Sequence, residues 1–207
     1  MKEGMGKILN FLAEADNLKS VLRFGSAKKM VGDSSAAHSW ELSLMVFIVA
    51  KDFKIDLDVE KSLKIAIVHD LAESVTGDID HVVMTDGGVS KKEEKKKAER
   101  KAMREITSKL PKESGEEIFA LWDEYEAGST REAKFVKALD KLETITYLIE
   151  LGHEVYDRPE IIPTYADKAV ESFPELKDLL REIKKRLKVE FIKGDLPWKK
   201  EYDKHLL

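Results

Sequence analysis

The sequence predicts an all-α protein, and three observations carry that expectation. Only five prolines and eleven glycines occur among 207 residues, so few positions interrupt regular secondary structure. Apolar side chains recur at spacings of three and four over most of the chain, the period of a helix with one buried face. Few segments alternate between polar and apolar residues, as half-buried strands require. We therefore expect a helical bundle.

The sequence predicts helices over 5–15, 18–24, 36–51, 59–74, 90–110, 114–126, 130–151, 164–172 and 174–190. Three of these starts carry the capping-box pattern of a serine followed three residues later by a glutamate: Ser90–Glu93, Ser129–Glu132 and Ser172–Glu175. Glycines are expected to end the helices, at Gly77, Gly87-Gly88, Gly128 and Gly152. We expect residues 78–89 to form an irregular loop that lines or covers a site.

Length and charge narrow the class of protein. With 207 residues and 43% hydrophobic content, the chain suits one soluble domain, which we place at residues 1–193, with a C-terminal arm at 194–207 that packs on the domain or on a partner subunit. A net charge of −4 argues against nucleic acid as a partner. The longest apolar stretch, Leu42 to Ala50, is too short to cross a membrane, and no secretory segment opens the chain. We expect a cytoplasmic protein with no membrane partner.

The adjacent residues His69 and Asp70 follow the apolar run Ile65–Val68, in a helix that is apolar nearly all round. Burial of an imidazole and a carboxylate costs free energy unless a partner satisfies them. A divalent cation is such a partner, because it binds both an imidazole nitrogen and a carboxylate oxygen. Glu73 projects from a neighbouring sector of the same helix. The alternative is a purely structural hydrogen-bond cluster.

Two more polar residues interrupt apolar stripes elsewhere. His38 precedes Leu42 by four residues on the apolar face of helix 36–51, and Asp140 borders the apolar face of helix 130–151. Considered alone, His38 is typical of a buried or helix-capping histidine whose hydrogen bonds are satisfied. Asp140, considered alone, is typical of an aspartate that forms an ion pair with a neighbouring lysine, Lys137 or Lys141.

Together, these residues from three helices offer two imidazoles and two carboxylates. Such a set can hold one metal ion and leave positions open for water and substrate, as catalytic sites do. Because the chain has no cysteine, any metal must be held by histidines and carboxylates.

The longer motifs carry a family resemblance from about Leu18 to about Leu148. They are Ala37-His38-Ser39, IAIVHDLAESVTGDI at 65–79, KKEEKKKAERKAM at 91–103 and LWDEYEAGSTREAKFVKALDKLE at 121–143. In these segments the chain resembles the HD-domain phosphohydrolases, and specifically their 5′-deoxynucleotidase group. The resemblance implies an all-α HD-domain bundle with a metal site in its core, and a homodimer. The implied cofactor is a divalent ion, Mn²⁺, Co²⁺, Mg²⁺, Fe²⁺, Ni²⁺ or Zn²⁺, because affinity alone does not select among them.

By motif position, the resemblance implies roles for individual residues. The metal ligands would be His38, His69, Asp70 and Asp140. Glu73 and Asp78 match two acidic positions that act on the catalytic water or, with Ile79, hold a second cation. Arg23 matches an arginine that orients the substrate phosphate, and Phe24 would follow it beside the sugar. Substrate binding would then involve Arg23, Phe24, Asp70, Asp78, Ile79 and Asp140.

Three positions depart from the family pattern. The residue before the first histidine is often acidic in these proteins, and here it is Ala37, so either the imidazole has lost an orienting residue or Ser35 or Glu41 replaces it. Phe24 stands where relatives often have a tryptophan, and it has no ring N–H. His81 follows in the expected loop, either as a local addition to the site or, as we favour, exposed to solvent.

The implied activity is metal-dependent hydrolysis of nucleoside 5′-monophosphates, preferably in the deoxy form. Two alternatives stay open at this point. One is an HD-type phosphodiesterase or a dNTP or alarmone phosphohydrolase, which calls for more cations around the cleft. The other is a non-catalytic helical scaffold with a vestigial HD site.

Overall fold

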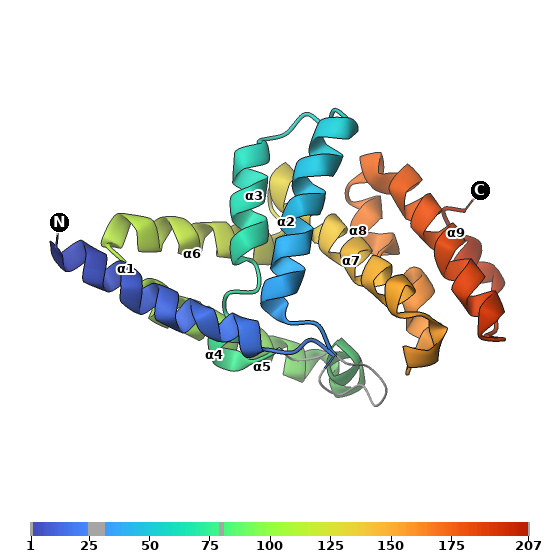
Figure 1. Ribbon diagram of the computed structural model, residues 1–207, viewed down its shortest axis with the longest axis horizontal. Helices are drawn as coiled ribbons and strands as arrows, with labels where there is room; N and C mark the ends of the chain where they lie inside the picture. Colours follow the sequence, from blue (N-terminus) through green and yellow to red (C-terminus); the bar gives the residue numbers. More distant parts are fainter. Residues whose placement is uncertain (1, 25–31, 79–80, 207) are drawn as a thin grey trace.

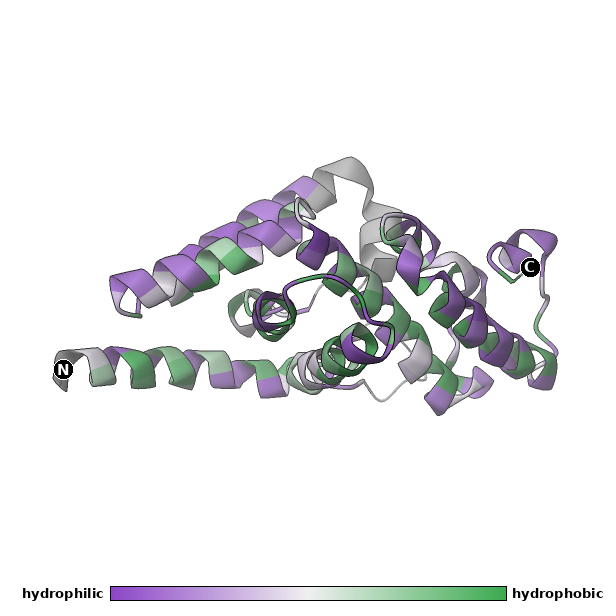
Figure 2. Ribbon diagram, turned by 90° about the horizontal axis from the view of Figure 1, so that it is seen from above, coloured by the Kyte–Doolittle hydropathy of each residue, from purple (hydrophilic) through white to green (hydrophobic). Residues whose placement is uncertain are grey.

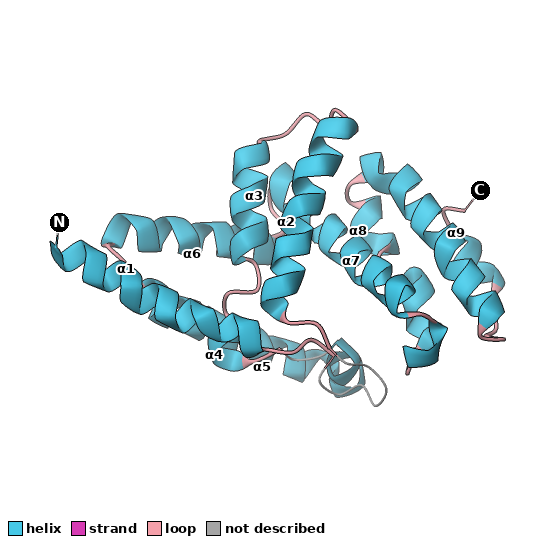
Figure 3. Cartoon of the chain, viewed as in Figure 1, coloured by secondary structure: helices cyan, strands magenta, loops and turns pink. Residues whose placement is uncertain are grey.

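The structure of the protein is a computed structural model that describes residues 2–24, 32–78 and 81–206 and, of residues 2–3 and 81–92, the backbone alone. Within these ranges the chain consists of helices and connecting loops, with one isolated antiparallel bridge between Leu22 and Ser34 (Figure 3). The predicted all-α class is confirmed.

The α-helices are α1 (Lys2–Ala15), α2 (Ser35–Asp52), α3 (Val59–Val68), α4 (Glu73–Thr76), α5 (His81–Thr107), α6 (Lys112–Ala127), α7 (Arg131–Leu151), α8 (Asp167–Glu171) and α9 (Lys177–Lys193). Short 3₁₀ turns lie between and after them, at Asp16–Ser20, His153–Val155, Pro159–Thr164, Pro174–Leu176 and Lys200–Asp203.

Helix α7 runs through the middle of the molecule and contacts α2, α3, α6, α8 and α9 (Figure 1). Four of its apolar side chains, Phe135, Leu139, Leu142 and Ile145, have no exposed surface. Full burial of such a side chain contributes about 1.5–3 kcal/mol relative to exposure. The packing around α7 therefore fixes where every polar residue on this helix points.

A second, smaller core joins α1 to the far end of the bundle. Phe11 of α1 packs there with Met103 of α5 and Trp122 of α6. Four apolar side chains of α1, Met5, Ile8, Leu9 and Leu12, are exposed. Figure 2 shows hydrophobic and hydrophilic stretches alternating along this helix, which carries the N-terminal label.

Two predictions about connecting segments are wrong. The expected loop over 78–89 is helical from His81 onward, and α5 extends through the adjacent glycines Gly87 and Gly88 and past Ser90. Each helical glycine costs only about 1 kcal/mol relative to alanine, which a helix of 27 residues can offset. The expected helix over 18–24 is instead a 3₁₀ turn that ends at Ser20 and an extended segment around Leu22.

Two helix starts also differ from the predicted capping boxes. Thr130, one residue after Ser129, caps α7 by accepting a hydrogen bond from the Ala133 N–H at 3.2 Å. Pro174 lies in a 3₁₀ turn, and α9 begins only at Lys177. Thr130 takes over the expected capping role of Ser129 one residue later, whereas no side chain caps the start of α9.

The residues after α9 fold back onto the body of the protein. Lys184 of α9 is fully buried, and its ammonium lies 2.7 Å from an Asp167 carboxylate oxygen and donates to the Lys204 carbonyl at 2.7 Å. The Tyr202 side chain is buried against this helix. Among the described residues, no helix combines the length and apolar character needed to span a membrane.

Candidate metal centre

Helix α2 carries His38 in its first turn. The Ser34 hydroxyl caps the helix by accepting a hydrogen bond from the Ala37 N–H at 3.1 Å. Leu42 and Val46, on the same face one and two turns later, are fully buried. Because His38 shares this buried face of α2, its ring points into the interior, and only 1% of the residue is exposed.

The predicted helix over 59–74 is interrupted at the His69-Asp70 pair. The His69 Nδ1–H donates to the Ala66 carbonyl at 2.8 Å, and the Leu71 N–H reaches back only three residues, to Val68 at 3.1 Å. In a regular helix adjacent side chains point about 100° apart. The turn that ends α3 instead brings His69 Nε2 within 3.1 Å of an Asp70 carboxylate oxygen.

Asp140 enters the centre from α7 and is buried. Its Oδ2 accepts hydrogen bonds from the Tyr125 hydroxyl and the Lys141 ammonium, both at 2.8 Å. Its Oδ1 lies 3.3 Å from His38 Nε2. The ion pair with Lys141 considered from the sequence thus exists, but it is buried and leaves one carboxylate oxygen facing the histidines.

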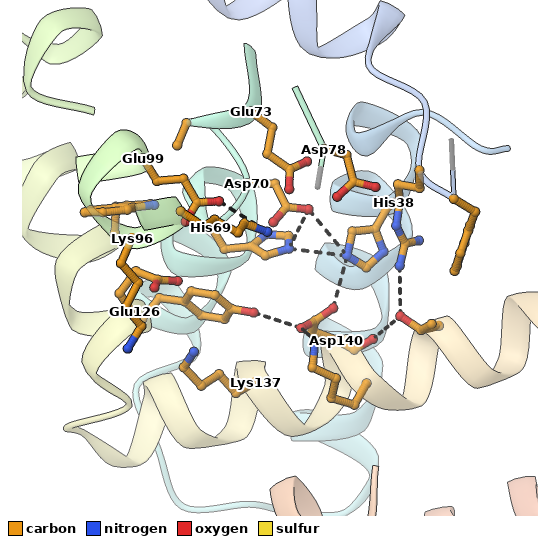
Figure 4. A pocket seen from close by; sticks show the side chains of 18 of the residues that line it. His38, His69, Asp70, Glu73, Asp78, Lys96, Glu99, Glu126, Lys137 and Asp140 are labelled. Atoms are coloured by element: carbon orange, nitrogen blue, oxygen red, sulfur yellow. Dashed lines mark hydrogen bonds and ion pairs between the residues drawn. The ribbon is translucent and has the colours of Figure 1, made fainter. Parts of the chain in front are cut away.

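The structure brings all four expected side chains to one point (Figure 4). His38 Nε2 lies 3.3 Å from His69 Nε2 and 3.8 Å from Asp70 Oδ2. Ligand atoms of His38, His69 and Asp140 all lie within 4.8 Å of one another. Imidazole nitrogens from α2 and from the turn after α3 and a carboxylate oxygen from α7 therefore lie around a common position, and Asp70 lies beside both imidazoles.

Both histidines are held so that Nε2 faces the cluster. The Ala66 carbonyl takes the His69 Nδ1 proton, and Glu143 lies with its Oε2 2.6 Å from His38 Nδ1. A proton on each Nδ1 leaves the Nε2 lone pair available to a metal ion. The expected orienting residues are wrong, because Ser35 donates to Glu73 and Glu41 makes no hydrogen bond to His38 in the described chain.

The electrostatics of the centre favour charged groups despite burial. Burial lowers the pKa of His38, but the hydrogen bonds to Asp140 and Glu143 outweigh it and raise that pKa to about 9. Against burial, the His69 charge lowers the pKa of Asp70, and the Lys141 charge with the His38 hydrogen bond lowers the pKa of Asp140. Two ionised carboxylates beside two imidazoles form a set that suits a divalent cation.

Glu73 begins α4 and is buried beside the centre. Its Oε2 accepts a hydrogen bond from the Ser35 hydroxyl at 2.7 Å. Burial first, and then the charges of Asp70 and Asp78, raise the pKa of Glu73 to about 9. Asp78 lines the same pocket after the turn at Gly77. Ile79 and the His81 side chain lie outside the described residues.

Arg23 reaches the site from the extended segment before α2. Its N–H donates to the Asp33 carbonyl at 2.8 Å, which ties this segment to the start of α2. The guanidinium donates to Glu143 at 3.2 Å and to the Thr144 hydroxyl at 2.8 Å. Its partner Glu143 is fully buried, and Arg23 itself lines the pocket.

Phe24 follows with a left-handed backbone, φ 59°, which is uncommon for a bulky residue. The Arg23 guanidinium lies 5.1 Å from its ring centroid, and the Tyr147 ring stacks on it at 6.3 Å. The two aromatic contacts hold the ring at the edge of the pocket.

The pocket around the cluster has a volume of about 320 Å³. Besides the expected residues it is lined by several that sequence reasoning missed, including Tyr125, Lys95, Glu99 and Lys137. These side chains come from α5, α6 and α7, and their convergence depends on how the helices pack. A polar pocket of this size with a cluster of metal-type ligands is typical of a small-molecule site.

The chain matches known proteins over most of its length. The sequence model of the HD domain family covers residues 15–166. The human protein named 5′-deoxynucleotidase HDDC2 is 33% identical over 187 residues, which span 87% of this chain and 86% of the human protein. The Schizosaccharomyces pombe protein named 5′-deoxynucleotidase hdd1 is 35% identical over 156 residues, 73% of this chain and 74% of the yeast protein.

A solved structure shares the fold. The protein described as "Predicted metal-dependent phosphohydrolase" from Magnetospirillum magnetotacticum MS-1 aligns with a TM-score of 0.74 and 24% sequence identity, over 95% of this chain and all of that one. The resemblance expected from the sequence motifs is confirmed, and the HD domain with its His/Asp cluster indicates a divalent metal cofactor. This chain belongs to the HD domain family.

Proposed function

We propose that this protein is a metal-dependent 5′-deoxynucleotidase that hydrolyses nucleoside 5′-monophosphates, preferably the deoxy forms, to nucleoside and phosphate. The observation that carries the proposal is the meeting of His38, His69, Asp70 and Asp140 at the floor of a pocket. The relatives named 5′-deoxynucleotidase, which match along most of the chain, support the same activity.

The four residues of the cluster would hold the cation. Two nitrogen and two oxygen donors suit Mn²⁺, Co²⁺, Fe²⁺, Ni²⁺ or Zn²⁺, and Mg²⁺ less well. When bound, such an ion polarises a phosphoryl oxygen and lowers the pKa of water.

Glu73 and Asp78 divide the proton transfers in this proposal. As water attacks phosphorus, the bond from phosphorus to the 5′ oxygen breaks, so one proton must leave the water and one must reach the leaving oxygen. In the metal-free protein, burial raises the pKa of Glu73 to about 9, so of the two acids Glu73 better suits the donor role. Asp78, whose negative charge helps to raise that pKa, suits the acceptor role toward the water. Arg23 would pair with the phosphate, and Phe24, with Ile79, would border the sugar.

A screen of phosphate release tests the activity. We expect the metal-loaded protein to release phosphate from dAMP, dGMP, dCMP or dTMP faster than from the matching ribonucleotides, dNTPs or cyclic dinucleotides. The Asp70→Ala variant should lose both metal and turnover while its helical circular dichroism remains. Full activity of that variant, or a wild-type preference for triphosphates or diesters, would contradict the proposal.

We also propose that the enzyme is a homodimer. Exposed apolar side chains form one stripe on α2, at Trp40, Leu44, Phe47 and Ile48, and another on α1, at Met5, Ile8, Leu9 and Leu12. Contiguous apolar patches of this kind on a soluble protein mark contact surfaces, and the family resemblance supports a second copy of this chain as the occupant. The cytoplasmic location expected from the sequence stays a prediction.

A further inference from the structure

The cations of the pocket differ in whether a carboxylate already neutralises them. Arg23 pairs with Glu143 at 3.2 Å, Lys141 with Asp140 at 2.8 Å, and Lys95 with Glu99 at 3.4 Å. The Lys137 ammonium makes no hydrogen bond or ion pair within the described residues, although it is half-buried in the pocket wall. Its close contact is the face of the Tyr125 ring, 4.1 Å from the ammonium nitrogen to the centroid.

The Lys137 side chain is held in this position by its surroundings. It projects from α7 one turn before Asp140, on the side of the cluster away from His38 (Figure 4). Its Cδ and Cε lie 3.6 Å from the place where a Cβ on Gly128 would be, so the stem packs on the turn between α6 and α7. Tyr125, under the ammonium, donates to Asp140. The charge is therefore directed at the rim of the metal centre.

A desolvated ammonium without a carboxylate partner is costly. Burial lowers the pKa of Lys137, even though the charges of Glu126 and Asp140 oppose the shift. An anion in the pocket would offset that cost with a charge-assisted hydrogen bond. Two carboxylate ligands already balance a divalent cation, so a phosphate dianion at the centre needs additional positive charge that is not already paired.

We infer that Lys137 binds a phosphate oxygen of the substrate, on the Tyr125 side of the metal centre, while Arg23 lies on the Glu143 side. The inference rests on the proposed function, because it places the phosphoryl group at the cluster. It adds a substrate-binding residue that the HD motif does not include.

Replacement of Lys137 by methionine tests the inference. Lys137→Met keeps the apolar stem and removes the charge. We expect kcat/KM to fall about 10- to 100-fold on dAMP, dTMP and p-nitrophenyl phosphate alike, since a hydrogen bond between charged groups contributes about 1.5–3 kcal/mol. Lys137→Arg should recover part of the loss. The control Lys134→Met, an exposed lysine on the same helix outside the pocket, should behave as wild type.

Two binding measurements separate this role from a structural one. Inorganic phosphate should bind the metal-loaded Lys137→Met protein about tenfold more weakly than wild type, by calorimetry without turnover, while metal affinity stays unchanged. A loss of metal affinity with unchanged phosphate affinity would mean that Lys137 only supports Tyr125. A loss of activity confined to the nucleotide substrates would place Lys137 at the base. Either result overturns the inference. If wild type hydrolyses no phosphomonoester, the proposed function fails, and phosphate binding still decides the role of Lys137.

Discussion

Glu143 connects the metal-facing histidine to the arginine of the pocket. One oxygen, Oε2, lies 2.6 Å from His38 Nδ1 and 3.2 Å from an Arg23 nitrogen, and no part of the residue is exposed. The same carboxylate therefore fixes the imidazole tautomer and the position of the guanidinium. Ala37, the residue before His38, has no side-chain group that could hold the imidazole, and Glu143 contacts its Nδ1 instead.

Glu143→Gln should weaken metal binding about 10- to 100-fold, the usual cost of losing a residue that orients a metal ligand. The amide keeps the volume but removes the charge that holds the His38 Nδ1 proton. Competition with a chromophoric chelator measures the change. The matched control is Glu41→Gln, a nearby half-buried glutamate that makes no hydrogen bond to His38 in the described chain. Equal affinity of the Glu143→Gln and wild-type proteins would show that the contact does not orient the ligand.

Metal affinity should rise with pH because His38 holds a proton that the metal must displace. Hydrogen bonds to Asp140 and Glu143 raise the pKa of His38 from 6.5 to about 9, against the effect of burial. Below about pH 9 the metal-free protein binds a proton that the complex releases, so apparent affinity increases with pH by up to about tenfold per unit and levels off above pH 9. Calorimetry in buffers of different ionisation enthalpy counts the released proton. A pH-independent affinity over this range would refute the expectation.

The raised pKa of His38 has the opposite effect on the stability of the metal-free protein, which falls as the pH rises. Because the folded pKa of His38 lies above the unfolded value, its stabilising contribution is complete below pH 6.5 and is lost as the pH rises through about 9. Metal-dependent stabilisation should therefore be largest at alkaline pH.

At the scale of elements, the sequence predicted which helices carry the site better than where they end. The apolar stripes of α2 and α7 placed His38 and Asp140 correctly on buried faces, because helical period alone decides that orientation. The break after Val68 was not predictable from periodicity, since it depends on the His69 ring bonding to the Ala66 carbonyl. That break is what brings adjacent residues to one position.

Lys184 fixes the C-terminal arm to α9. Lys184→Met should leave Asp167 buried without its ion pair and the Lys204 carbonyl without its donor, at a cost of about 3–5 kcal/mol of unfolding free energy. Denaturant titration measures the change, and hydrogen exchange should increase at 198–204. The exposed neighbour variant Lys185→Met serves as the control. A stable Lys184→Met protein with a protected arm would show that the apolar contacts of Tyr202 suffice.

At the scale of the whole molecule, the sequence indicated the fold and the four clustered residues but not the remainder of the pocket. Tyr125 and Lys137, which line the pocket, and Glu143, which contacts His38, are ordinary polar residues in their helices, and only the packing of α6 and α7 against α2 and α3 brings them to the centre. One signal for Glu143 was available, a glutamate directly after Leu142, a residue of the apolar face of this helix. Without a contact partner, however, sequence does not distinguish it from an exposed residue.

The proposed homodimer predicts that charges on the α2 stripe will separate the subunits. Trp40 and Phe47 are 68% and 50% exposed, and each would bury most of that surface in an interface. The double variant Trp40→Glu, Phe47→Glu should elute as a monomer in light-scattering chromatography while wild type elutes as a dimer. A double variant with glutamates at the exposed lysines Lys177 and Lys185 is the control. A monomeric wild type at micromolar concentration would end the dimer proposal.

Titration of the metal-stripped protein with Co²⁺ tests the central claim most directly, because visible absorption reports the ligands as well as the stoichiometry. We expect saturation at one equivalent for wild type and loss of the tight signal in His69→Ala, Asp70→Ala and Asp140→Ala, with the helical content retained. A wild-type protein that takes up no stoichiometric cobalt, or variants whose spectra and affinities equal those of wild type, would contradict the account of these side chains as a shared metal site.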